Sequence, residues 1–166
     1  MGDSVWWGLL GVFAGGALPW LEAVVVIPGG IIAGLPVVPV LIAGVVGNLL
    51  TVGLAAFAGD WGRERIAARR RRRAARRDAQ AEPHVAHRRA ARRRRRRDRI
   101  EHIMDRGGLP LLALLGPLGL GTQVSALVAV ATGVGPARTF AWIGGATVFW
   151  SLVAAGITIA GFEAFR

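Results

Sequence analysis

The chain has 166 residues, 53% of them hydrophobic, with 21 basic and 10 acidic residues that give a net charge of +11. A soluble domain of this size cannot bury so much apolar surface, so we expect an all-α integral membrane protein. The sequence contains no cysteine, which excludes a disulfide framework and thiolate chemistry.

The first apolar block, residues 4–21, is expected to form a helix. This helix either makes a short span or lies at the membrane interface. Asp3 or Ser4 could cap its start, and Trp6 suits an interface because an indole has one polar edge. Pro19 limits how far the helix runs unbroken.

Residues 23–59 form the longest apolar run, with no charged residue over 37 positions. As one helix this run would be about 55 Å long, nearly twice the hydrocarbon core of about 30 Å. Its three prolines, Pro28, Pro36 and Pro39, and the pair Gly29-Gly30 all fall in the first half, where they would break a helix. We therefore expect a re-entrant hairpin over about 22–35, with Pro28-Gly29-Gly30 at its tip, and a true span over 37–59.

The polar loop 60–106 carries the charge, with 19 arginines against seven acidic residues. Because basic residues gather in short cytoplasmic loops, we expect this loop to be cytoplasmic. We expect two helices, or two partly ordered halves, that meet at Pro83. No metal site is expected there, because the three histidines have no carboxylate or cysteine at a specific ligand spacing.

Three interpretations of this Arg-rich loop remain open. It could be a solvated orientation signal, a clamp on anionic lipid headgroups, or a nucleic-acid-binding segment. No aromatic residue that could stack on bases stands between Gly62 and Gly108. We therefore expect anionic membrane lipids, and no nucleic acid, as partners.

The second membrane half begins with 31 uncharged residues, 107–137. This run is also too long for one straight span, at about 46 Å if helical. We expect a re-entrant hairpin over about 107–131, broken at Pro117 in the segment GPLGLGTQ. A clean span over 139–162 follows.

The two membrane halves, residues 1–59 and 107–166, can be compared at an offset of 100. Pro36 then aligns with Pro136, Gly44 with Gly144 and Thr51 with Ser151. With the Arg-rich loop inside, the two spans run in opposite directions. We therefore predict an inverted repeat of hairpin plus span, the plan on which many transporters place a site at mid-membrane.

The acidic residue before the Pro-Gly break, the segment AGVVGN and the later GPLGLGTQ together resemble the small multidrug export family, a relative of the DedA and VTT membrane proteins. The resemblance covers nearly all of the chain except the Arg-rich insertion. It implies two re-entrant hairpins that face each other, and a role in moving lipid-like or amphipathic molecules. The Arg cluster typical of DedA proteins has no clear counterpart after GPLG, where only Arg138 is found.

Glu22 is the residue expected to carry the mechanism. An ionised carboxyl is costly at membrane depth, so Glu22 could take up and release a proton; alternatively it only hydrates or caps a hairpin. The remaining candidates lie at helix breaks or offer polar groups inside apolar segments: Pro28, Gly29, Gly30, Asn48, Pro117, Gly119, Thr122, Gln123 and Arg138. Asn48 could contact substrate or hold two helices together by hydrogen bonds. Thr122 and Gln123 could satisfy broken backbone or face a cavity.

No enzyme constellation and no cofactor motif stands out in the sequence. Two hypotheses follow. The first is a cell-membrane transporter or lipid flippase that moves an amphipathic or lipid-like substrate, with proton coupling through Glu22. The second is a non-catalytic scaffold that binds anionic lipid through the Arg-rich loop. Four membrane segments enclose little interior, so a homodimer or larger homo-oligomer is expected.

Overall fold

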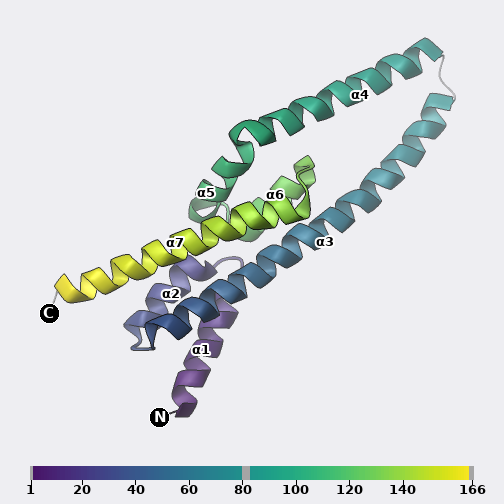
Figure 1. The fold of residues 1–166 in the computed structure, drawn as a ribbon. Coiled ribbons are helices and arrows are strands. Elements are labelled where there is room, and N and C mark those ends of the chain that lie inside the picture. Colours follow the sequence, from purple (N-terminus) through teal and green to yellow (C-terminus); the bar gives the residue numbers. More distant parts are fainter. Residues whose placement is uncertain (1, 80–82, 165–166) are drawn as a thin grey trace.

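A computed structural model describes residues 2–79 and 83–164 of the chain (Figure 1). These residues are entirely helical apart from short turns, which confirms the all-α expectation. In chain order the elements are α1 (Gly2–Ala17), α2 (Glu22–Ile32), α3 (Val37–Ala79), α4 (Pro83–Ile103), the π-helical turn η1 (Met104–Gly108), α5 (Leu109–Gly119), α6 (Thr122–Thr132) and α7 (Pro136–Ala164).

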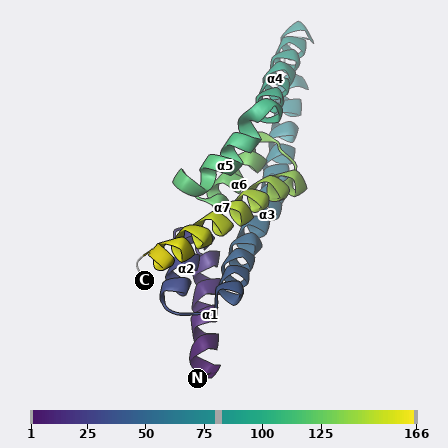
Figure 2. The same ribbon diagram turned by 60° about the vertical axis from the view of Figure 1, so that its left-hand side comes forward.

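Two of the described helices, α3 and α7, are long and apolar enough to cross a membrane. Only 28% of the most apolar window of each is buried inside the chain, whereas the core helix of a soluble protein is mostly buried. The two helices pack together and run in opposite directions (Figures 1 and 2). The spans expected over 37–59 and 139–162 therefore lie within α3 and α7.

The expected hairpin over 22–35 is wrong. Residues 22–32 form one helix, α2, with Pro28 inside it. A proline within a helix removes one backbone hydrogen bond, and here packing offsets that loss, since Ile27 and Gly30 are buried. The chain turns instead at residues 18–21, because the position before Pro19 disfavours helical backbone. For the same reason α1 ends at Ala17, short of the expected 21.

The hairpin expected over 107–131 corresponds to two helices, α5 and α6, but its break is not at Pro117. Pro117 lies inside α5, and the chain turns at Leu120 and Gly121. Gly121 has a φ of 87°, which side chains disfavour, so this glycine sets the position of the turn. Before α5, the turn η1 contains Gly107 at a φ of 154°, which kinks the chain after α4.

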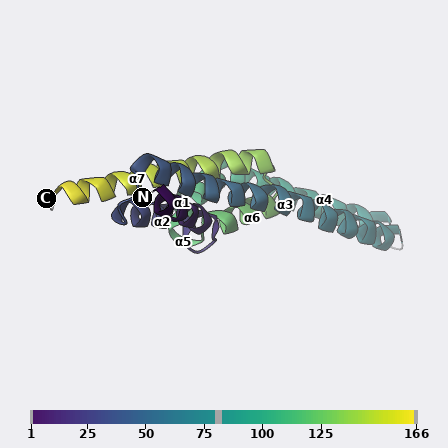
Figure 3. The ribbon, with the colours of Figure 1, turned by 90° about the horizontal axis from the view of Figure 1, so that it is seen from below.

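The Arg-rich loop is a projecting pair of helices, which we call the Arg arm (residues 60–79 and 83–103). α3 does not end at residue 59, where the expected span ends, but continues to Ala79. No proline interrupts the segment, and Arg and Ala favour helix. α4 begins at Pro83, as expected, and returns toward the packed helices (Figures 1 and 3). The connection 80–82 lies outside the described residues.

Glycines allow α1 and α3 to approach closely. A Cβ added at Gly47 would overlap the carbonyl oxygen of Phe13, and one added at Gly16 would lie 2.5 Å from the carbonyl oxygen of Gly44. Small residues promote such backbone contacts between membrane helices. A buried apolar cluster that includes Val12, Ile27 and Val40 continues this packing to α2.

Candidate functional site

The candidate site lies where two helical turns meet. The turn between α1 and α2 contacts the turn between α5 and α6, although about a hundred residues separate them in sequence. In Figure 1 the pair α1–α2 lies below α7 and the pair α5–α6 lies mainly above it. Glu22 begins α2 at the first turn, and Thr122 begins α6 at the second.

Glu22 caps α6 from another part of the fold. Its Oε1 accepts hydrogen bonds from the Thr122 backbone N–H and, at 3.1 Å, from the Thr122 hydroxyl. The residue before the helix, Gly121, has no side chain that could do this, so Glu22 takes the place of an ordinary N-cap. Glu22 is 6% exposed and has a φ of 42°. Strained backbone of this kind occurs at functional sites when the surrounding structure enforces it.

Gly121 leaves room for the Glu22 carboxylate. A Cβ at Gly121 would lie 3.1 Å from Glu22 Oε1 and 3.4 Å from the carbonyl oxygen of Pro19. The positive φ of Gly121 is disfavoured for any other residue. The backbone conformation therefore favours glycine at this position, and a side chain would also press against the Glu22 carboxylate.

Three acceptor oxygens surround the Thr122 hydroxyl. Besides Glu22 Oε1, they are Asn48 Oδ1 at 3.2 Å and Gln123 Oε1 at 3.0 Å. A hydroxyl has one proton to donate, so these oxygens compete for it. The Thr122 hydroxyl thus has more neighbouring acceptors than protons to donate.

The Gln123 amide is held in one orientation. Its Nε2 donates to Thr51 Oγ1 at 3.0 Å, and the Thr51 hydroxyl donates in turn to the carbonyl oxygen of Asn48 at 3.0 Å. Because the proton of Thr51 is used on its own helix, Thr51 accepts from Gln123. Gln123 Oε1 must then face Thr122. Thr147 of α7 completes the cluster, with its Oγ1 3.5 Å from Asn48 Oδ1.

Several buried polar atoms, two of them in this cluster, have no hydrogen-bond partner among the described residues. They are Glu22 Oε2, Asn48 Nδ2, Ser125 Oγ, Thr139 Oγ1 and Ser151 Oγ. Leaving such groups unpaired is costly, and they concentrate where a ligand or proton completes the network. Glu22 is the only carboxylate of the cluster, and the described part of the chain contains no group of three His, Asp or Glu that could hold a metal ion.

A cavity of about 380 Å³ opens beside Glu22. Its walls come from the two turns, the last turn of α5 and the first turns of α2 and α6: Pro19, Trp20, Glu22, Val24, Val25, Pro117, Gly119, Leu120, Gly121 and Val124. Trp20 is 93% exposed at this position. The cavity thus joins one carboxylate to an otherwise uncharged wall.

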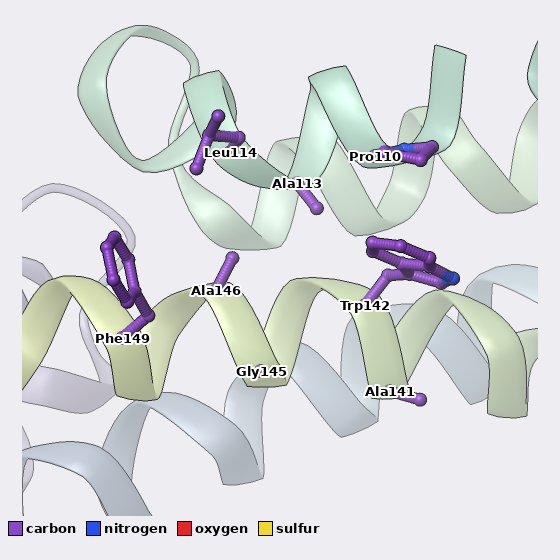
Figure 4. Close-up of a pocket in the computed structure, with 8 residues that line it drawn as sticks. All are labelled: Pro110, Ala113, Leu114, Ala141, Trp142, Gly145, Ala146 and Phe149. Atoms are coloured by element: carbon purple, nitrogen blue, oxygen red, sulfur yellow. The ribbon is translucent and has the colours of Figure 1, made fainter. Parts of the chain in front are cut away.

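Apolar grooves run along the outside of α7. One groove, of about 390 Å³, lies between α5 and α7, where Ala113 and Ala146 face each other and Trp142 and Phe149 form the two ends (Figure 4). A second groove, of about 470 Å³, lies between α3 and α7 beside Phe140. Both have the apolar character that suits hydrocarbon chains.

Six of the ten candidate residues lie at this site. Glu22, Asn48, Thr122 and Gln123 form the polar cluster, and Pro117 and Gly119 line the cavity. The other four lie elsewhere: Gly30 packs against Val12 and Val40, Pro28 and Gly29 lie within α2, and Arg138 is exposed in the first turn of α7.

Sequence reasoning missed Gly121, Trp20 and Thr147. The offset of 100 could have indicated the first of these, since it aligns Glu22 with Thr122 and so makes Gly121 the residue before the second helix.

Comparison with known proteins finds no matching protein family, no matching curated protein and no matching solved structure.

Proposed function

We propose that the chain is a small multi-pass transporter or lipid flippase of the cell membrane, similar in plan to the DedA-related proteins, and that it moves an amphipathic or lipid-like substrate. The observation that carries this proposal is the buried Glu22 carboxylate where the two turns meet, beside a cavity. Carboxylates buried within membrane proteins commonly mark substrate or proton pathways. Glu22 is the proton-binding residue of this proposal.

The arrangement of helices supports an inverted repeat. α2 and α6 each contain 11 residues and begin at positions 100 apart. α3 and α7 follow them and run in opposite directions (Figure 1). In this proposal α3 and α7 cross the bilayer, and the pairs α1–α2 and α5–α6 re-enter it from opposite faces. Transporters of this kind place their substrate between such repeats.

The grooves along α7 provide a path for the tail of the substrate. Its polar headgroup would lie at the Glu22 cavity while hydrocarbon remains in an apolar groove or in the bilayer. A flippase needs a polar place for the headgroup and an apolar place for the tail, because moving the headgroup unaided through hydrocarbon is costly. The proposed homodimer or larger assembly would cover part of the apolar surface of α3 and α7.

Flux of a fluorescent amphipathic lipid in proteoliposomes tests the transporter. We expect a pH gradient to drive flux in the wild type, and Glu22→Gln to reduce that flux at least about tenfold because the side chain no longer titrates. Glu64→Gln is the matched control, since Glu64 is exposed on the Arg arm. Flux that keeps its pH dependence in Glu22→Gln would refute proton coupling through this residue.

The Arg arm favours a second function, that of a scaffold that binds anionic lipid. Arg89, Arg92, Arg93 and Arg96 line one hollow of about 500 Å³ on α4. Nearer the apolar half of α3, Arg63 and Arg70 share a cavity of about 410 Å³ with apolar residues. Guanidinium groups beside apolar surface match the chemistry of an anionic phospholipid.

Replacing the four arginines that line the hollow on α4 with glutamine is expected to reduce tethering of anionic vesicles to neutral proteoliposomes by at least about tenfold, because each basic side chain at such a surface contributes about 1 kcal/mol. Light scattering measures the tethering. Replacement by lysine keeps the charge and serves as the control. Equal tethering by the glutamine and lysine variants would contradict the lipid-binding role of the Arg arm.

A further inference from the structure

The first turns of α2 and α6 meet head to head at Glu22 and Thr122. Each helix contains 11 residues, and the first turn of a helix leaves backbone N–H groups without an acceptor in the same helix. The helix dipole adds a partial positive charge at this end. Two helix ends of this kind at one point favour a negative charge between them.

The carboxylate of Glu22 already occupies the end of α6. Its Oε1 accepts the Thr122 backbone N–H, the same contact that a bound phosphate or carboxylate makes at a helix N-terminus. Its Oε2 is buried and has no partner within the described residues. Glu22 thus lies at an anion-binding position with only 6% of its surface exposed. One of its two carboxylate oxygens makes the hydrogen bonds there, and the other makes none among the described residues.

The adjoining cavity could receive an external anion. Its lining includes Val24 and Val25 from the first turn of α2 and Val124 from the first turn of α6. Among the described residues that line this cavity, Glu22 is the only charged one. The polar cluster next to it, formed by Asn48, Thr122, Gln123 and Thr147, carries no charge. An ionised Glu22 would repel a second anion here, whereas a neutral Glu22 would not.

We propose that the α2 and α6 N-termini form a binding site for the anionic headgroup of an amphiphile, and that the Glu22 carboxylate is a built-in competitor which yields the site when it is protonated. This inference rests on the proposed transporter function and specifies its substrate class. One proton bound at Glu22 accompanies one singly charged anion, so the loaded site is electrically neutral. A neutral loaded site lowers the cost of carrying both through the membrane interior.

Equilibrium binding of short-chain fluorescent phosphatidylglycerol tests the proposal, with the protein in nanodiscs of zwitterionic lipid. This phosphodiester keeps one negative charge at both pH values used, about pH 5 and about pH 8. We expect the wild type to bind it about tenfold more tightly at the lower pH. Glu22→Gln should bind with the tighter affinity at both pH values, because its side chain is neutral throughout. Short-chain fluorescent phosphatidylcholine should show neither effect.

A matched pair at Thr122 tests the backbone contact. Thr122→Pro and Thr122→Val both remove the hydroxyl, but only Thr122→Pro removes the N–H. Proline is accepted at the first position of a helix, and Gly121 has a ψ of 147°, which suits a residue before proline. We expect Thr122→Pro to bind phosphatidylglycerol about tenfold more weakly than Thr122→Val at the lower pH, because the proline variant loses one charge-assisted hydrogen bond to the anion.

Equal phosphatidylglycerol binding by the wild type and Glu22→Gln at both pH values would overturn the proposal, as would equal tightening for phosphatidylcholine. The Glu22 comparison decides the question even if Thr122→Pro does not fold. The flux assay separates this inference from the proposed function. Selective binding without flux would refute transport and leave the anion site standing, whereas flux without selective binding would refute the anion site alone.

Discussion

Gly47→Ala is expected to yield protein whose α1 and α3 no longer pack. A Cβ at this position overlaps the carbonyl oxygen of Phe13 and lies 3.3 Å from the backbone nitrogen of Ala17. All of these atoms belong to helix backbone, which cannot rotate away as a side chain can, so the two helices must separate. Overpacking of this kind costs about 1–3 kcal/mol and occasionally more. Because α1 leads directly into the turn that holds Glu22, we expect both folding and flux to fail.

Thermal unfolding in detergent, followed by size-exclusion chromatography and intrinsic fluorescence, measures this effect. Gly11→Ala is the matched control, because Gly11 lies on α1, the helix that packs against Gly47, and a Cβ there meets nothing within 4 Å. Alanine favours helix over glycine by about 1 kcal/mol, so the control should unfold at an unchanged or slightly higher temperature. If Gly47→Ala unfolds at the same temperature as Gly11→Ala, the close contact between α1 and α3 is wrong.

Gly121→Ala is expected to abolish flux while most of the helical packing survives. The φ of 87° at Gly121 costs about 1–3 kcal/mol for any other residue. The new Cβ would also lie 3.1 Å from Glu22 Oε1, which displaces the carboxylate from the N-terminus of α6. We expect flux in proteoliposomes to fall at least about tenfold, since the cap and the proton-binding group are disturbed together.

Circular dichroism of the same preparation shows whether the helices persist. Gly156→Ala is the control, because Gly156 lies on α7 away from the two turns and a Cβ there meets nothing within 4 Å. It should transport as the wild type does. Normal flux in Gly121→Ala would show that the position of Glu22 at α6 is not needed for transport.

The straight continuation of α3 limits what the Arg arm can contact. Residues 60–79 extend about 30 Å beyond the apolar half of the helix at about 1.5 Å per residue. Exposed charges are screened beyond about 8 Å at physiological salt. If α3 crosses the bilayer, arginines near its base, such as Arg63, face the headgroups of the same membrane. Those near the far end, such as Arg76, meet other anionic surfaces, which is why the vesicle-tethering experiment uses a second population of vesicles.

The sequence by itself determined the helical class of the described residues and several boundaries. Long uncharged runs predicted an all-helical chain with two long apolar helices, and such helices are present as α3 and α7. Pro36 correctly indicated the start of α3 at Val37, and Pro83 indicated the division of the Arg arm. These features depend on hydrophobicity and on the missing N–H of proline, which are local properties. Glu22 was also identified from the sequence, because a lone carboxylate beside apolar segments is conspicuous.

The tertiary structure alone decided where the chain turns and what Glu22 contacts. Pro28 and Pro117 were expected to break helices, but each lies inside one, because a single lost hydrogen bond is offset by packing. The contact between Glu22 and Thr122 joins positions 100 residues apart, and no local pattern encodes the distance between two such turns. That contact arises only when α3 and α7 pack in opposite directions and bring the two helix N-termini together. The site is therefore a product of long-range packing, although each of its residues is visible in the sequence.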